Sequence, residues 1–287
     1  MDLLTLEIFC TVAREGSVTR AAELLQRAQS SVTTRVQQLE EDLGVTLFLR
    51  EGRRMALTAE GETLQGYAMR LLALADEARQ ALLPGRPGGR LRLGSMESTA
   101  ASRLPGPLAR LHARWPDVQL ELRTGPTRAL VDAVAAHAID CALVALPPPG
   151  IDALPPALEA APVFTESLLL ALPPGHPPVR SAADLQVATL AAFAPGCTYR
   201  QIGEAWMARD GAGPRVLELA SYHAILACVA GGHCAGVVPR SVLALMAAPP
   251  ALRLVPLQDC DTVLLQRRGY RSAALEALWA ELAVPAR

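Results

Sequence analysis

The chain of 287 residues contains no lysine and no asparagine, so all 27 of its basic side chains are arginines. Every cationic contact is therefore made by a planar guanidinium fork, which suits bidentate binding of carboxylates and phosphates. Because 28 acidic residues bring the net charge to -1, bulk charge cannot hold the chain on a nucleic acid. Such binding would need a local group of arginines.

The sequence also lacks the marks of an exported, membrane-spanning or metal-binding protein. It starts with no basic and apolar leader, and no apolar run reaches the roughly 18 residues of a membrane span. Its six cysteines form no CxxC pair, which favours reduced thiols over a disulfide framework. Cys228, Cys234, His223 and His233 fit no common zinc spacing. We therefore expect a cytoplasmic protein without a metal or cofactor.

Common catalytic motifs are missing as well. The chain contains no GxSxG, HExxH or P-loop, and its five histidines have no evident acidic partners. We therefore expect that it is not an enzyme. Its length suits about two domains, and a hydrophobic content of 51% provides for a sizeable core.

Residues 5–62 contain two short amphipathic runs separated by a tight polar break. Gly16 ends the first predicted helix, and Ser17 suits the N-cap of the next. A third helix is predicted from about Gln29 to Leu43, and residues 45–57 then form two short strands around a turn that contains glycine. The buried stripe expected on the third helix comprises Val32, Val36, Leu39 and Leu43. The whole pattern is typical of a winged helix-turn-helix, which places one helix in a DNA groove.

A long helix follows, from about Thr58 to Leu83, and its apolar residues are spaced like a coiled-coil seam of a little under three heptads. We favour a dimer helix, and the alternative is a helix that packs only on its own domain. The predicted seam comprises Leu64, Ala68, Leu71, Ala75, Ala78 and Leu82. A linker rich in proline and glycine covers residues 84–89.

From residue 90 onward, short apolar strands alternate with helices, which is the order of an α/β domain. Ligands of such domains bind beyond the carboxyl ends of parallel strands. The strands are predicted at residues 90–94, 118–122, 141–145, 164–172, 189–193, 216–219, 237–239 and 262–266. We therefore divide the chain into a DNA-binding domain (1–58), a linker helix and hinge (59–89) and an α/β domain (90–287).

The first 60 residues closely resemble the DNA-binding domain of LysR-type transcriptional regulators, with the family spacing preserved without gaps. The matching residues are Phe9, Gly16-Ser17, Ala21-Ala22, Leu24, Gln29-Ser30, Leu39-Glu40, Leu43-Gly44, Leu47-Phe48, Arg50, Leu57-Thr58 and Gly61. Ala28 departs from the small hydroxyl residue that is usual in the family, and Ser30-Ser31 departs from Pro-Ala or Ser-Ala. The start of the recognition helix is therefore where the resemblance transfers least.

The resemblance implies an α+β multi-domain fold: an N-terminal winged helix-turn-helix, a long linker helix, and a C-terminal two-lobed α/β effector domain like a periplasmic binding protein. Lobe I would comprise about 90–162 and 266–287, and lobe II about 163–265. It also implies a sequence-specific regulator that binds double-stranded DNA and is controlled by a small molecule between the lobes. The expected assembly is a homodimer through the linker helix and a homotetramer as in relatives, with RNA polymerase as a further partner.

Charge is segregated within the first 60 residues, which hold seven arginines and nine acids. Glu23 is the only acid between Ser17 and Gln37. Because a recognition helix enters the major groove with its N-terminal residues, we expect base contacts from Gln29, Ser30, Ser31, Thr33, Thr34 and Arg35. The other DNA-binding candidates, most of them suited to phosphate oxygens, are Ser17, Arg20, Arg27, Arg50, Arg53 and Arg54. Helix capping or solvated surface is the alternative reading for the hydroxyl residues.

Strand-to-helix loops supply the effector-binding candidates, because they offer free backbone N–H groups and hydroxyls to a carboxylate or amino-acid-like ligand. Glu97 is unusual for an anion site, and it would either pair with an ammonium group or favour the start of its own helix. The candidates are Ser95, Met96, Glu97, Ser98, Thr99, Thr124, Gly125, Thr127, Cys197, Thr198, Tyr222 and His223. Two alternative functions stay open: a thiol-based redox sensor at Cys197, and a solute-binding protein without a DNA function.

Overall fold

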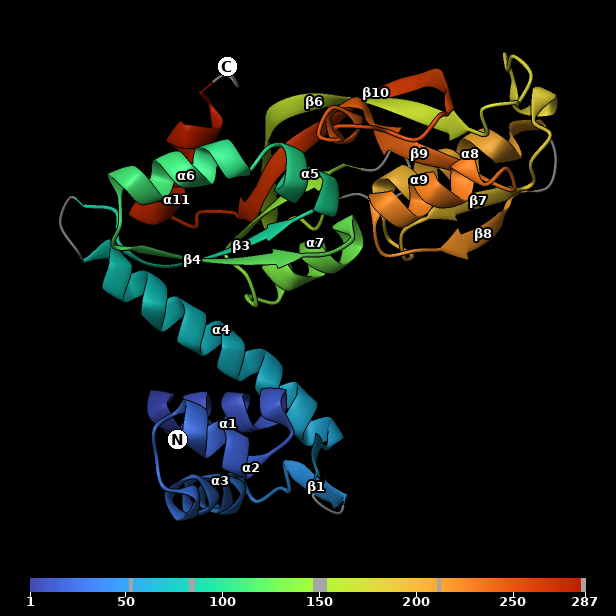
Figure 1. Ribbon diagram of the computed structural model, residues 1–287. Coiled ribbons are helices and arrows are strands. Elements are labelled where there is room, and N and C mark those ends of the chain that lie inside the picture. The colour runs from blue at the N-terminus through green and yellow to red at the C-terminus, as the bar shows by residue number, and fades with distance from the viewer. Residues whose placement is uncertain (52–53, 83–85, 147–153, 211–212, 285–287) are drawn as a thin grey trace. The chain divides into compact units, whose positions relative to one another are not determined.

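The computed structural model describes the chain except residues 52–53, 83–85, 147–153, 211–212 and 285–287 (Figure 1). The chain divides into two compact units, which consist chiefly of residues 1–84 and 85–287. None of the described helices combines the length and the apolar character needed to cross a membrane.

The first unit begins with three helices, α1 (Leu3–Glu15), α2 (Val18–Leu24) and α3 (Gln29–Leu43). As predicted, Gly16 ends α1 in the left-handed conformation at φ 59°, and the Ser17 hydroxyl caps α2 by accepting from the Arg20 N–H at 3.4 Å. The predicted stripe of α3 is buried at Val32, Val36 and Leu39. Leu43 was expected to be buried but is 41% exposed, because it occupies the last position of the helix, just before the chain turns at Gly44.

The wing consists of β1 (Phe48–Glu51) and β2 (Arg54–Leu57), paired antiparallel. The first strand was predicted to begin at Val45 but begins three residues later. There the Glu40 carboxylate, on the last turn of α3, accepts the N–H groups of Leu47 and Phe48 at 2.7 and 3.2 Å. The chain leaving α3 is thus bonded to that helix before it enters the sheet.

The long helix α4 (Ala59–Ala81) packs its first half into the core of its own unit. Leu64 and Ala68, which we expected in a dimer seam, contact that core, and Ala68 is fully buried. This is the alternative weighed above, and it holds for the first part of the helix. Further along, Ala75 is half-buried and Ala78 is exposed. The large apolar side chains exposed on and just after α4 are Tyr67, Leu71, Leu74 and Leu82.

The second unit is built on an eight-stranded sheet in the order β4-β3-β5-β10-β6-β9-β7-β8. The strands are β3 (Gly89–Ser95), β4 (Val118–Thr124), β5 (Cys141–Ala145), β6 (Leu158–Leu172), β7 (Thr189–Ala192), β8 (Arg215–Glu218), β9 (Ala235–Pro239) and β10 (Arg253–Arg267). At one end β3 pairs parallel with β4 and β5, and at the other β7 pairs parallel with β8 and β9. These parallel groups form lobes I and II.

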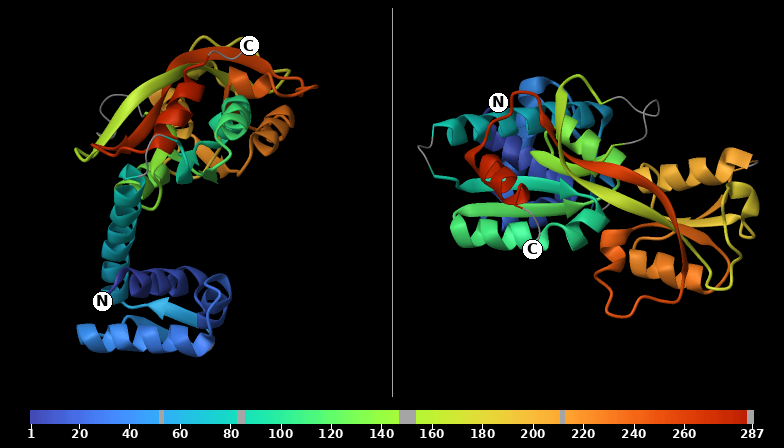
Figure 2. Two further views of the ribbon diagram at one scale, coloured as in Figure 1. Left: turned by 90° about the vertical axis from the view of Figure 1, so that its left-hand side faces the viewer. Right: turned by 90° about the horizontal axis from the view of Figure 1, so that it is seen from above.

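Strands β6 and β10 pair antiparallel with each other and run through both lobes (Figure 2). They extend well beyond the predicted segments 164–172 and 262–266. The outer parts were not predicted because buried and exposed residues alternate there and form no continuous apolar run. Residues Thr262–Gln266 pair with β5 of lobe I. This pairing favours a lobe boundary on β10 a few residues earlier than position 265.

Helices cover both faces of each lobe, which therefore has two apolar layers (Figure 1). In lobe I, α6 and α11 pack on one face and α7 on the other. In lobe II, α8 and α9 take opposite faces. The helices of this unit are α5 (Glu97–Ser102), α6 (Pro105–Arg114), α7 (Thr127–Ala135), α8 (Thr198–Met207), α9 (Tyr222–Ala230), α10 (Arg240–Leu243) and α11 (Ala273–Leu282), with short 3-10 turns at Ala182–Asp184 and Ala208–Asp210.

Candidate functional site

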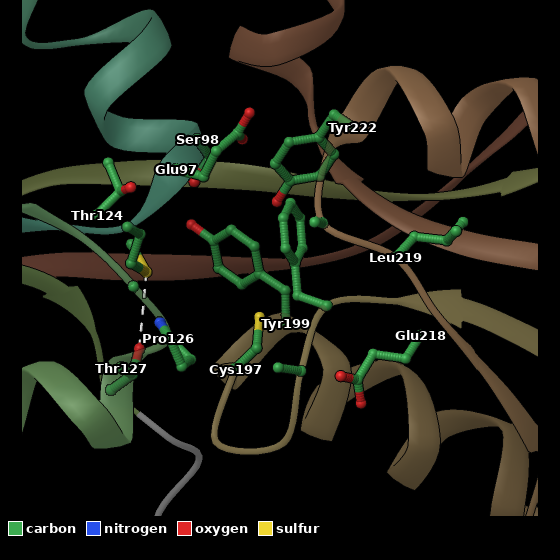
Figure 3. A pocket seen from close by; sticks show the side chains of 15 residues that line it. Glu97, Ser98, Thr124, Pro126, Thr127, Cys197, Tyr199, Glu218, Leu219 and Tyr222 are labelled. Carbon is green, nitrogen blue, oxygen red and sulfur yellow. Dashed lines mark hydrogen bonds between the residues drawn. The ribbon is translucent and has the colours of Figure 1, made fainter. Parts of the chain in front are cut away.

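A cavity of about 320 Å³ lies between the two lobes, at the carboxyl ends of β3, β4, β7 and β8 (Figure 3). Each of these strands is followed by a loop and a helix, so four strand-to-helix loops converge on the space, as expected for parallel strands. Its residues are Met96, Glu97, Ser98, Thr124, Gly125, Pro126, Thr127, Phe193, Ala194, Cys197, Tyr199, Glu218, Leu219, Ala220 and Tyr222. The volume is at the lower end of the range for small-molecule sites.

Eight of the twelve predicted effector-binding residues line this cavity, and Ser95, Thr99, Thr198 and His223 do not. Ser95 is fully buried, and its hydroxyl donates to the Met96 carbonyl at 3.0 Å. The Thr198 hydroxyl donates to the Ala145 carbonyl at 2.7 Å, which ties lobe II to lobe I beside the cavity. Ser95 and Thr198 therefore have structural roles in this arrangement.

Of the three rings in the aromatic wall of the cavity, only Tyr222 was predicted, and Phe193 and Tyr199 were not. Phe193 packs edge-on against Tyr222 with ring centroids 4.9 Å apart, and Tyr199 lies beside them. Figure 3 shows the hydroxyl groups of Tyr199 and Tyr222 pointing from lobe II into the cavity. The Tyr199 hydroxyl is buried without a hydrogen-bond partner. Aromatic residues make up only 4% of the sequence, so three rings around one cavity are a concentration that only the folded structure reveals.

The polar groups of the cavity are mainly acidic or neutral. Burial raises the pKa of Glu97, and His223 opposes that shift only in part. The Oε2 atom of Glu97 is buried and has no hydrogen-bond partner. The second carboxylate, Glu218, is more exposed and pairs with the Arg200 guanidinium at 3.3 Å. Among the described residues that line the cavity there is no arginine or histidine.

Cys197 stands at the N-cap of α8 and borders the same cavity. Burial raises the pKa of its thiol, and backbone N–H groups at the start of the helix counteract this only partly. A reactive cysteine needs the opposite shift, toward the thiolate. The chemistry of this site therefore does not favour the redox alternative. In the described part of the chain, no three His, Cys, Asp or Glu side chains are grouped to hold a metal ion.

At the DNA-binding end, the predicted base-reading residues Gln29, Ser30, Ser31 and Thr34 are exposed at the start of α3. That helix starts after Ala28 without a side-chain cap, so its first hydroxyl residues are not used as the N-cap. Thr33 is half-buried, and its hydroxyl donates to the Gln29 carbonyl at 3.0 Å.

Arg35 has an intramolecular partner that the sequence did not reveal. Its guanidinium donates to the Asp2 carboxylate at 3.2 Å and to the Thr5 hydroxyl at 3.4 Å, both at the start of α1. The Arg35 side chain is 46% exposed, so the ion pair is open to water. It therefore competes with any base contact but is weak enough to be broken.

The other predicted phosphate-binding groups are distributed over α2, the turn after it and the wing. Arg20, Arg27 and Arg54 are exposed, and no described carboxylate pairs with them. Arg53 and the side chain of Arg50 lie outside the described residues. The Ser17 hydroxyl is used as the cap of α2.

A winged helix-turn-helix, a long helix and a two-lobed domain with an interlobe cavity define a DNA-binding regulator with a ligand-binding domain. Two family models match the chain: the bacterial regulatory helix-turn-helix protein of the lysR family over residues 3–62, and the LysR substrate binding domain over residues 84–284. The chain belongs to the LysR family and is a DNA-binding transcription regulator with an effector-binding domain.

Similar proteins agree with this assignment. The uncharacterized HTH-type regulator YusT of Bacillus subtilis is 38% identical over 90% of this chain and 86% of its own length. GltR of the same organism is 38% identical over 85% of this chain and 81% of its own length. Full-length OxyR from Pseudomonas aeruginosa, in a variant form, has the same fold with a TM-score of 0.73 at 22% identity, covering 100% of this chain and 99% of its own. The structure of CbnR in complex with its target DNA has a TM-score of 0.66 at 23% identity, covering 98% of this chain and 99% of its own.

Proposed function

We propose that a small molecule in the interlobe cavity controls how this regulator binds its operator. The observation that carries the proposal is the convergence of four strand-to-helix loops on a cavity that retains buried, unpartnered polar atoms. Such atoms cost free energy until a ligand supplies their partners. A ligand that prefers one arrangement of the lobes would shift the protein toward it.

Footprinting tests this control directly. The operator is first selected from random DNA with the full-length protein, and small molecules are screened by thermal shift. DNase footprints and DNA bend angles are then compared with and without each molecule that binds. We expect the bound molecule to change the footprint or the bend. Identical footprints and identical bend angles would contradict the proposal.

For the DNA contacts, we propose that Gln29, Ser30, Ser31 and Thr34 read bases and that Arg54 contacts phosphate. Gln29→Ala should then weaken binding to the selected operator more than to random DNA. Arg54→Ala should weaken both alike and reduce the slope of log affinity against log salt by about 1. Equal losses for Gln29→Ala on both DNAs would contradict its role in sequence reading.

Arg35 either reads a base or braces α3 against α1, and its partner Asp2 separates the two roles. Asp2 also caps α1 by accepting from the Thr5 N–H at 2.7 Å, so the variant used is Asp2→Asn, which keeps a cap acceptor and removes the charge. If Arg35 reads a base, Asp2→Asn frees its guanidinium, and operator binding is unchanged or stronger while Arg35→Ala loses sequence preference. If it only braces the helices, both variants weaken binding to operator and random DNA by similar factors. We propose the first role, because the Asp2–Arg35 pair is open to water and such exposed ion pairs contribute little to stability.

We also propose that the chain forms a homodimer through the exposed apolar side chains of α4, namely Tyr67, Leu71 and Leu74. Leu71→Asp should shift sedimentation equilibrium toward the monomer. The exposed residue Glu62 on the same helix provides a control, and Glu62→Ala should leave the assembly unchanged. An unchanged mass for Leu71→Asp would exclude this face from the dimer. The same sedimentation experiment measures whether the wild-type protein forms the expected homotetramer.

A further inference from the structure

We infer that the interlobe cavity takes a small ligand with an apolar body and a positively charged ammonium group, and that Glu97 is its counter-ion. This rests on the proposed function, in which the cavity is the effector site. Of the two effectors expected from the sequence, a carboxylate and an amino-acid-like molecule, it keeps the ammonium group of the second and drops the simple carboxylate.

The charge of the cavity lining favours a cation over an anion. A carboxylate ligand would need a guanidinium, an imidazolium or several free N–H donors to offset its desolvation. The described lining residues include two carboxylates, Glu97 and Glu218, and no arginine or histidine. The chain contains no lysine that could serve instead. The Arg200 guanidinium, which pairs with the lining residue Glu218 at 3.3 Å, is also held by Glu204 at 2.9 Å. An anion would thus meet two carboxylates and no cationic side chain among the described lining residues.

The carboxyl group of Glu97 lacks a partner that a cationic ligand would supply. Its Oε2 atom is buried and accepts no hydrogen bond, although a carboxylate oxygen in that position normally finds a donor. Burial also raises the pKa of this carboxyl group. A ligand ammonium group donates up to three hydrogen bonds and carries the opposite charge, so it would satisfy the orphaned oxygen and favour the ionised carboxylate.

Aromatic rings from lobe II line the cavity across from Glu97. Phe193, Tyr199 and Tyr222 present aromatic rings to the same space, and rings attract cations through their negative faces. The remaining lining is largely apolar, with Met96, Pro126 and Leu219, and suits an aliphatic or aromatic body. The buried, unpartnered Tyr199 hydroxyl offers a further hydrogen bond to a polar group on that body.

The test uses two sets of matched probes on the full-length protein: phenethylamine, phenylacetate and phenethyl alcohol, and hexylamine, hexanoate and hexanol. Affinities are measured by calorimetry for the wild type, for Glu97→Gln and for Glu121→Gln. Glu121 is an exposed carboxylate on β4 outside the cavity, so its variant controls for the change in overall charge. Glutamine keeps the shape of the side chain, removes its charge and replaces one acceptor oxygen with an NH2 donor.

We expect each amine to bind at least about tenfold more tightly than its matched carboxylate. A charge-assisted hydrogen bond of the usual strength corresponds to a loss of about ten- to a hundredfold in amine affinity for Glu97→Gln. The alcohols should change little, and Glu121→Gln should match the wild type. Carboxylates that bind as tightly as the amines, or an amine preference that survives in Glu97→Gln, would overturn the inference and leave the proposed function intact. If no probe binds and no small molecule stabilises the protein, both fail.

Discussion

The contact between Glu40 and the wing gives the sharpest test of how the DNA-binding unit is assembled. One carboxylate oxygen, half-buried at the end of α3, accepts two backbone N–H groups, from Leu47 at 2.7 Å and from Phe48 at 3.2 Å. Hydrogen bonds to a charged group contribute about 1.5–3 kcal/mol each when buried. Water reaches this site in part, so we expect Glu40→Ala to destabilise the first unit by about 2–3 kcal/mol.

Glu40→Gln keeps a neutral acceptor oxygen and should cost only about 1 kcal/mol. Glu41→Ala, the neighbouring exposed carboxylate, is the matched control and should stay within about 0.5 kcal/mol of the wild type. For a unit of this size, the loss in Glu40→Ala corresponds to a fall in melting temperature of about 8–24 °C. DNA affinity should fall as well, because the wing is no longer held in position on α3.

The two units are followed separately in the assay. All three tryptophans, Trp115, Trp206 and Trp279, lie in the second unit, so their fluorescence reports only on that unit. Far-UV circular dichroism includes the helices of the first unit, and hydrogen exchange of residues 45–57 follows the wing itself. We expect earlier loss of the dichroism signal, faster exchange in the wing and an unchanged fluorescence transition. A Glu40→Ala protein as stable as Glu41→Ala would refute the reasoning.

Three further predictions concern other parts of the chain. Gly61→Ala should destabilise the first unit by about 1–3 kcal/mol despite the higher helix propensity of alanine, because a Cβ at this position would lie 2.2 Å from the Leu47 carbonyl oxygen. Unfolding followed by circular dichroism tests this, and a stabilised variant would contradict it. Burial raises the pKa of Glu97, so ionisation of this carboxyl group destabilises the folded state once the pH exceeds its unfolded pKa. Glu97→Gln should therefore have the same melting temperature as the wild type at about pH 4 and a higher one, by a growing margin, as the pH rises toward neutral. A difference in melting temperature that does not change with pH would refute this. Thr198→Val keeps the shape of the side chain but removes its donor to the Ala145 carbonyl, which still accepts from the Thr127 hydroxyl at 3.3 Å. The unfolding free energy followed by fluorescence should therefore fall by about 0.5–1.5 kcal/mol, and no change would show that the contact is unimportant.

Local chemistry made much of the fold predictable. The limits of α1 and α3 follow from glycines that adopt the left-handed conformation, Gly16 and Gly44, and these signals act within one turn of the chain. The strands of the parallel groups were found from their apolar runs and, at residues 118–122, from alternating apolar residues. Strands β6 and β10 were predicted too short, because their outer parts are half-exposed and lack such a run.

The sites were harder to predict because they depend on contacts between distant residues. The four cavity loops were found, since strand ends are recognisable in the sequence. That Arg35 pairs with Asp2, 33 positions away, could not be inferred from spacing. Phe193 and Tyr199 had no polar signature to separate them from core residues, and only the sheet topology brings them opposite Glu97.

The bonds between the lobes indicate how a weak ligand could control this protein. Besides Thr198 with Ala145, the lobes are tied by Ser102 with Ser241 at 3.2 Å, by Arg103 with Glu166 at 2.6 Å, and by the Arg128 N–H with the Gly196 carbonyl at 3.1 Å. Neutral hydrogen bonds contribute about 0.5–1.5 kcal/mol net and charged ones about 1.5–3 kcal/mol, so these four ties amount to a few kcal/mol. A ligand shifts the lobes only by its difference in affinity between their arrangements. One ammonium–carboxylate contact made in a single arrangement would supply a difference of that size.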